Sequence, residues 1–155
     1  MTPRTRILSA LYGIAAAAYL LDRATKALAE HHLAGRPPIR VIPHVVQFRY
    51  ATNSGGAFSL LAGQPWVFFT ASAAVCLGIV IASPRIRSTA AAVGVGLILG
   101  GALGNVTDRI VRGPGVSGTV VDFIDFHVWP VFNLADSAIV LGALVVALSS
   151  ARHQQ

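Results

Sequence analysis

Charged residues are scarce in this chain, and their scarcity argues against an ordinary soluble domain. Only 12% of the 155 residues are Asp, Glu, Lys or Arg, whereas 54% are hydrophobic. Because a soluble domain has about 25% charged residues, a globule of this composition would expose a largely apolar surface to water. The composition therefore favours a protein whose solvent is the lipid bilayer.

Cysteine is almost absent. Cys76 is the only one, so an internal disulfide cannot form, and it has no partners at metal-ligand spacing. The five histidines form no zinc motif such as HExxH. We therefore expect neither a metal nor another cofactor.

The net charge of +6 invites a nucleic-acid interpretation, but the distribution of the charges argues against it. The twelve Lys and Arg residues are scattered singly or in pairs between apolar runs, without a basic stripe or aromatic-interleaved patch. Since nucleic-acid binding depends on clustered positive charge, we expect no nucleic-acid partner.

Four apolar stretches are long enough to cross a membrane, which takes about 20 helical residues. They cover about 7–27, 65–83, 89–106 and 132–150. The segment of about 37–62 is different, because it combines a β-prone, partly alternating stretch with turn-forming residues. We therefore predict an all-α integral membrane protein with four transmembrane helices and a small extracytoplasmic β-sheet, forming one domain over residues 1–155.

The first stretch also has features of a secretory signal peptide, with Arg4 and Arg6 ahead of an apolar run. No convincing cleavage site precedes the charged pair at Asp22 and Arg23. We therefore interpret this stretch as an uncleaved membrane span.

The third stretch carries Gly96, Gly100 and Gly104. Small residues spaced by four allow a second helix to approach closely. The spacing predicts tight helix packing there rather than chemistry.

All six acidic residues fall at one end of the predicted bundle. With four spans, both termini lie on one side, and the acids lie at the opposite span ends or in the loops there. They are Asp22, Glu30, Asp108, Asp122, Asp125 and Asp136. The arginine-containing N-terminus and the short loop with Arg85 and Arg87 favour a cytoplasmic side for the termini, which puts the acids on the extracytoplasmic side.

Ionisable groups at the edge of membrane spans are costly and usually functional. A transporter or proton relay would place its acids nearer the midplane, whereas here they crowd the interface, where water and a peptide can both reach them. A small transporter or proton channel is one alternative to an enzyme, and a non-catalytic membrane assembly subunit is another.

Four motifs stand at the ends of the spans on the acidic side. They read DRATK at 22–26, NSGGAF at 53–58, GALGNVTDR at 101–109 and VDFIDFHVWPVFNLADSAI at 121–139. In order and position they resemble the motifs of the lipoprotein signal peptidases (signal peptidase II), and the resemblance covers nearly the whole chain. It implies a multi-pass protease of the bacterial cytoplasmic (inner) membrane. It also implies that the substrates are prolipoproteins with a diacylglyceryl-modified cysteine, cut immediately before that cysteine.

The resemblance assigns catalysis to the aspartates of VDF and FNLAD, which are Asp122 and Asp136. Chemistry supports the pairing, because two carboxylates sharing a site cannot both ionise cheaply. The ionised one can take a proton from water while the protonated one polarises the scissile carbonyl. The sequence leaves open which of the two is the base. Asp108, beside Arg109, is expected to be an ion-paired structural acid, and Asp125 a solvated loop acid.

Asparagines accompany two of these aspartates. Asn133 lies three residues before Asp136, so it can orient that carboxylate or cap the fourth helix. Asn105 and Asp108 have the same spacing at the end of the third span.

The resemblance places Asn53 and Arg109 at the binding cleft and gives Asp22 and Lys26 a supporting role. The acid-first spacing of four between Asp22 and Lys26 also fits a plain helical ion pair. We expect a monomer that works within the phospholipid bilayer.

A Ser–Lys protease is an alternative mechanism. Lys26 is the only lysine and would activate Ser54 or Ser59. Nothing in the spacing fixes either serine against the lysine, and this mechanism would not need a cluster of acids.

Overall fold

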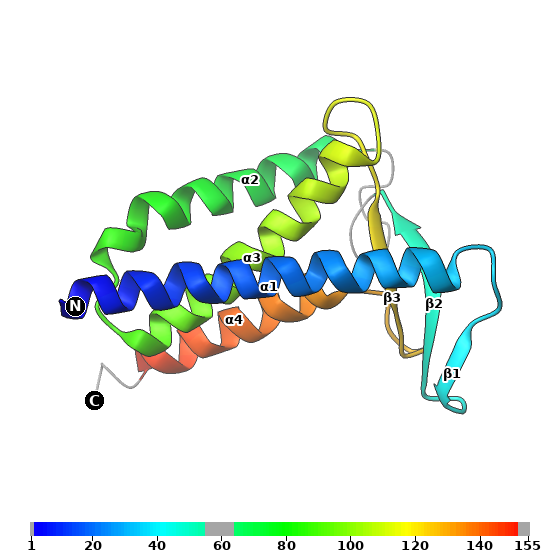
Figure 1. Ribbon diagram of the computed structural model, residues 1–155, viewed down its shortest axis with the longest axis horizontal. Helices are drawn as coiled ribbons and strands as arrows, with labels where there is room; N and C mark the ends of the chain where they lie inside the picture. The colour runs from blue at the N-terminus through cyan, green and yellow to red at the C-terminus, as the bar shows by residue number, and fades with distance from the viewer. Residues whose placement is uncertain (1, 55–63, 152–155) are drawn as a thin grey trace.

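The computed structural model describes residues 2–54 and 64–151, in which four long helices carry a small sheet at one end (Figure 1). The helices are α1 (Pro3–Leu33), α2 (Pro65–Ala82), α3 (Thr89–Val111) and α4 (Leu134–Ala151), with the short 3-10 helix η2 (Ser83–Arg85) after α2. All four long helices are apolar enough to cross a membrane. The predicted membrane fold is confirmed.

Two helices run beyond the predicted spans at the sheet end. α1 continues past residue 27 to Leu33, and α3 continues past residue 106 to Val111. The sequence prediction ended the first span just after Asp22, Arg23 and Lys26, and the third span just before Asp108. In the structure those charges pair between α1 and α3, so the helices continue through them.

α3 packs closely against α1 along its glycine face. A Cβ atom at Gly96 or Gly100 would collide with the carbonyl oxygen of Leu11 or Ala15. The predicted tight packing at these glycines is confirmed, and it brings the two backbones close enough for side chains to bridge them further along.

A second small-residue contact joins α3 to α4. A Cβ atom at Gly101 would meet the carbonyl oxygen of Ala135, and Gly94 faces the backbone of Gly142. α2, in contrast, packs mainly on α3 and contains no buried residue. The tightly packed unit is therefore α1, α3 and α4, with α2 beside it.

The sheet has three antiparallel strands in the order β1 (Ile39–Ile42), β2 (Val46–Asn53) and β3 (Val120–Asp125). Figure 1 shows it at the end of the bundle opposite the start of α1 and the end of α4. Phe123 packs against Ala29 and Leu33 of α1, so the extended end of α1 seats the sheet. The rest of the predicted β-prone segment, from residue 55 on, lies outside the described residues.

The register of β3 separates its two aspartates. Residues three apart on a strand point to opposite faces, so Asp122 and Asp125 face different surroundings. Asp122 pairs with Ala51 of β2, and Asn53 is its diagonal neighbour on the same face, whereas Asp125 pairs with Gln47. The sheet therefore places Asp122 and Asn53 next to each other on the same face.

Candidate active site

Asp122 and Asp136 line a single cavity of about 380 Å³ between the helices and the sheet. Asp122 comes from β3, and Asp136 comes from the first turn of α4. Asn53, Asn105 and Arg109, which the sequence also singled out, line the same cavity. Most of the other lining residues are apolar, among them Phe68, Trp129, Phe132 and Ile139.

Asn133 connects the two cavity aspartates. The backbone N–H of Asp136 donates to Asn133 Oδ1 (2.9 Å), and the N–H of Asn133 donates to Asp136 Oδ2 (3.3 Å), which is the reciprocal pattern of a capping box. Asn133 Nδ2 also donates to Asp122 Oδ1 (2.7 Å). The two roles considered for this residue, capping the helix and contacting a carboxylate, therefore occur together.

The remaining donors to the pair are also uncharged. Asn53 Nδ2 donates to Asp122 Oδ2 (3.0 Å), and Asn105 Nδ2 donates to Asp136 Oδ1 (2.9 Å). Within residues 2–54 and 64–151, none of the ion pairs involves Asp122 or Asp136. Amide groups rather than cations hold both carboxylates.

This environment favours a proton on Asp122, whose side chain is almost fully buried. Burial and then the negative charge of Asp136 raise the pKa of Asp122 to about 7, against the opposing hydrogen bonds from Asn53 and Asn133. Near neutral pH the pair can therefore hold a proton that an exposed aspartate would have lost.

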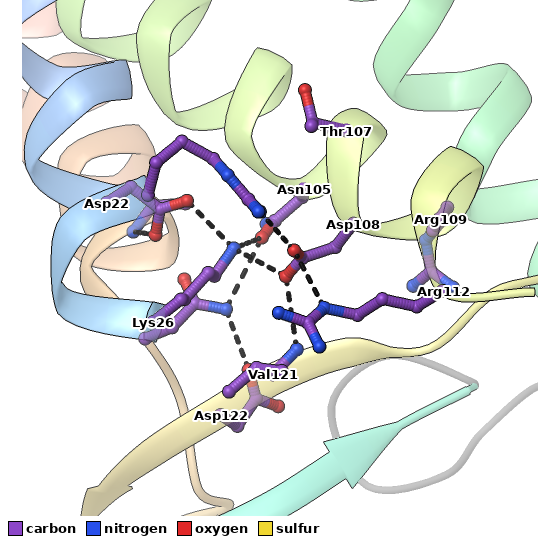
Figure 2. A network of polar contacts seen from close by, with 12 residues as sticks. Asp22, Lys26, Asn105, Thr107, Asp108, Arg109, Arg112, Val121 and Asp122 are labelled. Atoms are coloured by element: carbon purple, nitrogen blue, oxygen red, sulfur yellow. Dashed lines mark hydrogen bonds and ion pairs between the residues drawn. The ribbon is translucent and has the colours of Figure 1, made fainter. Parts of the chain in front are cut away.

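A second pair of carboxylates lies behind the cavity, around Lys26 (Figure 2). The ammonium group of this fully buried lysine is 2.8 Å from Asp22 Oδ2 and 3.1 Å from Asp108 Oδ2, and it donates to Asn105 Oδ1 (2.9 Å). The ammonium group thus contacts acceptors on both α1 and α3, and the ion pair predicted between Asp22 and Lys26 is confirmed.

These contacts leave Lys26 in a poor position to serve as a base. Its contacts in the described part of the chain are with Asp22, Asn105 and Asp108 rather than with a serine hydroxyl. Ser59, one of the two serines considered for a Ser–Lys mechanism, lies outside the described residues. The geometry around Lys26 does not support that alternative.

Asp108 is ion-paired, but not with the neighbour that the sequence suggested. Its partners are Arg23, Lys26 and Arg112, and its Oδ2 also accepts the N–H of Val121 (3.2 Å). Adjacent helical residues do not face each other, whereas residues four apart do. The expected pairing with Arg109 is therefore wrong, and Arg112 takes its place.

The Lys26 network also fixes the start of α4. Asp22 Oδ1 accepts the N–H of Ala135 (3.0 Å), and a Cβ atom at Gly104 would occupy the position of the Asp22 carboxylate. Because Ala135 immediately precedes Asp136, this contact from α1 helps to hold the catalytic candidate in place.

Arg109 points toward the cavity side of α3. Its Nη1 donates to the carbonyl oxygen of Gly118 (3.2 Å), and its guanidinium carbon lies 5.5 Å from the centre of the Phe68 ring. The residue is nearly buried, so it places a fixed positive charge in the cavity wall.

Asp125 is not the solvated loop acid expected from the sequence. It is a nearly buried residue at the end of β3, and its Oδ2 accepts from Gln47 Nε2 (2.8 Å) and Arg49 Nε (2.6 Å). Burial would raise the pKa of this carboxyl, but hydrogen bonds from Gln47, the His127 N–H and Arg49 lower it to about 2. Asp125 does not line the cavity with the other two.

Sequence reasoning missed Arg23 and Arg112 as partners of Asp108 and Phe68 as a partner of Arg109. The i, i+4 spacing from Asp108 to Arg112 was a usable signal, whereas the other two contacts join different helices. In the described ranges, no three His, Cys, Asp or Glu side chains are grouped so that they could hold a metal ion.

Comparisons with known proteins agree with this architecture. The family model described as signal peptidase (SPase) II matches residues 14–152. A lipoprotein signal peptidase of Rhodococcus jostii (strain RHA1) is 41% identical over 149 residues, covering 96% of this chain and 74% of the relative. The lipoprotein signal peptidase of Mycolicibacterium smegmatis is 44% identical over 146 residues, covering 93% of this chain and 62% of the relative. A bacterial membrane enzyme solved in meso at 2.3 Å resolution superimposes with a TM-score of 0.79 at 27% identity, over 92% of this chain and 87% of that one.

Proposed function

The chain belongs to the signal peptidase II family, membrane proteases that remove signal peptides from prolipoproteins, and on this premise we propose that it cleaves by the joint action of Asp122 and Asp136. The observation that carries the proposal is that two carboxylates from separate elements line one cavity and accept hydrogen bonds from the same residue, Asn133, whose side chain donates to Asp122 and whose backbone N–H donates to Asp136. Family membership also sets aside the transporter and assembly-subunit alternatives.

The two aspartates differ in the groups that can stabilise a negative charge on them. Asp136 lies in the first turn of α4, where the helix dipole and the N–H of Asn133 stabilise a negative charge. Asp122 has its pKa raised to about 7. We therefore assign Asp136 as the initial base and Asp122 as the initial acid.

The proposed reaction is peptide hydrolysis by a bound water molecule. Asp136 takes a proton from the water, whose oxygen attacks the scissile carbonyl carbon while Asp122 gives its proton to the carbonyl oxygen. Asp136 then passes its proton to the leaving nitrogen as the C–N bond breaks, and Asp122 recovers a proton from the collapsing gem-diol. The products are a new carboxylate on the signal peptide and a new amino group on the lipoprotein.

Arg109 and Asn53 have positioning roles in this proposal. Arg109 presents a guanidinium group in the cavity wall and is oriented by Gly118 and Phe68, so it can hold a backbone carbonyl of the substrate. Asn53 orients the Asp122 carboxylate through its 3.0 Å hydrogen bond. Asp22 and Lys26 support the site from behind through Ala135 and Asn105.

The substrate we propose is a prolipoprotein with a diacylglyceryl-modified cysteine, cut on the N-terminal side of that cysteine. The cavity lies where the apolar spans end and the sheet begins, so the acyl chains can stay in the bilayer while the scissile bond reaches the aspartates. The residues that line the cavity come from β2, α2, α3, β3, α4 and the connection between β3 and α4 of one chain, and α1 supports them from behind. We therefore expect a monomer to suffice and the helices and sheet to act as one peptidase domain.

We propose that the termini are cytoplasmic and the site extracytoplasmic. Arg4, Arg6, Arg85 and Arg87 all belong to the end of the bundle opposite the sheet, and basic residues favour the cytoplasmic side.

A gel-shift cleavage assay in detergent tests the dyad. It would compare the wild-type protein, Asp122→Asn and Asp136→Asn on a diacylglyceryl-modified prolipoprotein. Glu30→Gln is the matched control, because it removes an acid that lies at the same end of the molecule but outside the cavity. We expect cleavage by wild type and the control, and a loss of roughly a hundredfold or more in each dyad variant, the usual contribution of a general acid or base. Folded Asp122→Asn protein that cleaves at the wild-type rate would refute the dyad.

A further inference from the structure

The connection between β3 and α4 is a loop whose two ends are held together. The N–H of Phe132 donates to the carbonyl oxygen of Ile124 (3.1 Å), and the N–H of Ile124 donates to that of Phe132 (2.9 Å). The rings of Phe126 and Phe132 stack with 5.7 Å between their centres. Residues 127–131 therefore form a loop whose first and last residues are fixed against each other.

The loop begins with an unfavourable turn at His127. This residue has a φ of 60°, and the N–H of Val128 donates to the carbonyl oxygen of Phe126 (2.7 Å), which closes a three-residue turn. A side chain other than glycine rarely adopts positive φ, and a γ-turn of this hand is rare and strained. Such a turn persists where its surroundings hold it.

Asp125 stabilises the turn at His127. Its Oδ1 accepts the N–H of His127 (2.8 Å), while Gln47 and Arg49 of β2 donate to its Oδ2. The carboxylate thus ties the turn to the sheet, and the His127 ring nitrogen lies 3.9 Å away on the same side.

The turn at His127 sets the position of the residues that follow it in the cavity wall. Trp129 and Pro130, the second and third residues after His127, line the cavity with Asp122 and Asp136. Trp129 is 58% exposed and Val128 is 92% exposed, so the loop presents apolar side chains at the mouth of the site, where a lipid-modified peptide would pass.

We propose that Asp125 is a positioning residue for substrate binding: by holding the turn at His127, it keeps Trp129 and Pro130 in the cavity wall. It takes no part in proton transfer, because it faces away from the dyad across β3. The inference rests on the proposed function, since it assumes that the cavity receives the substrate.

The test measures binding and chemistry separately in Asp125→Ala. With a synthetic diacylglyceryl-modified prolipoprotein peptide, we expect KM to rise roughly fivefold to tenfold, as the loss of a charge-assisted hydrogen bond would allow, while kcat stays within about twofold. The chain has two tryptophans, so the Trp66→Phe background leaves Trp129 as the only tryptophan, which excitation at the red edge of the absorption band selects over tyrosine. Its emission maximum and its quenching by acrylamide should both change with Asp125→Ala.

A second substitution that relieves the strain at His127 distinguishes a positioning role of Asp125 from a general contribution to stability. Glycine adopts positive φ without strain, so His127→Gly added to Asp125→Ala should restore most of the KM and of the Trp129 signal. Glu30→Gln, which removes an ion-paired acid at the same end of the molecule, should change neither. If Asp125→Ala fails to fold, Asp125→Asn and Arg49→Gln undergo the same two measurements.

The outcomes are distinct. An unchanged KM with an unchanged Trp129 signal overturns the proposal, and so does a fall in kcat at constant KM. If wild type does not cleave the peptide, the proposed function has failed, but the fluorescence and its rescue by His127→Gly still decide whether Asp125 holds the loop.

Discussion

Two pairs of carboxylates lie at the sheet end of this molecule, and they differ in what offsets their charge. Asp22 and Asp108 surround Lys26, and Asp108 also pairs with Arg23 and Arg112. Asp122 and Asp136 receive hydrogen bonds from asparagine side chains and backbone N–H groups instead.

The difference has a chemical consequence. Cations offset the charge of the first pair, whereas the two carboxylates of the second pair are held by neutral donors and compete for a proton. The cation-paired acids therefore join helices, and the amide-held acids remain able to exchange a proton. Asn105 links the pairs, because it accepts from Lys26 and donates to Asp136.

The largest stability effect should come from removing the cation of the first pair. Lys26→Met leaves Asp22 buried without its ion-pair partner, which costs about 3–5 kcal/mol of unfolding free energy. Thermal unfolding in detergent should show a clear fall in Tm, partly reversed by Asp22→Asn in the same chain. A stable but inactive Lys26→Met protein would mean that Lys26 takes part in the chemistry.

The second pair, Asp122 and Asp136, should make both stability and activity depend on pH near neutrality. The pKa of Asp122 is raised from 3.8 to about 7, so between these values the folded state holds a proton that the unfolded chain has released. Its contribution to stability is therefore present at low pH, declines as pH rises toward 7 and is fully lost above 7. Activity should fall as pH rises through 7, because the acid then loses its proton. The measurements are kcat/KM and Tm from pH 5 to 9.

Asp122→Asn is the control for this titration, because its Tm should no longer carry the component that declines as pH rises toward 7. A wild-type rate that stays constant up to pH 9 would contradict the assignment of Asp122 as the acid.

Asn133 caps the start of α4 and also donates a hydrogen bond to Asp122 of the dyad. Asn133→Ala should therefore lower both the stability of the fold and the rate of cleavage. Loss of the cap costs about 1 kcal/mol, and loss of the donor to Asp122 should lower kcat as well. Parallel Tm and rate measurements check this, with Ser137→Ala as a matched change in the same helical turn. A fall in Tm without any change in rate would limit Asn133 to capping.

The smallest effect should come from an exposed pair. Glu30, whose side chain is 47% exposed, bonds Arg112 through both carboxylate oxygens at 2.9 Å. Surface ion pairs contribute about 0–1 kcal/mol, so Glu30→Gln should leave the rate unchanged and shift Tm only slightly. A large loss would show that Arg112 needs Glu30 in order to hold Asp108.

The sequence could predict features that depend on local periodicity. Apolar length located the four helices, and glycine spacing predicted that another helix packs closely against α3. The motif order brought Asp122 and Asp136 forward as a pair, and the i, i+4 rule found Asp22 with Lys26.

Contacts between distant elements could not be predicted in this way. The Arg49 partner of Asp125 depends on the register of β2 against β3, and the Arg23 partner of Asp108 depends on how α1 crosses α3. Asn105 shares its spacing with Asn133, yet only the tertiary structure reveals that it contacts Lys26 and Asp136 together. The missed contacts explain why Asp125 was expected to be solvated.

The most direct test of the difference between the two pairs is a side-by-side measurement of Tm and cleavage rate for Asp122→Asn and Asp108→Asn at pH 8. We predict that Asp122→Asn is inactive with a Tm at or above that of wild type, because a carboxyl that resists ionisation has been replaced by a neutral group. We predict that Asp108→Asn has a clearly lower Tm, because three cations lose their shared partner. Equal losses of Tm in both variants, or an active Asp122→Asn, would contradict these predictions.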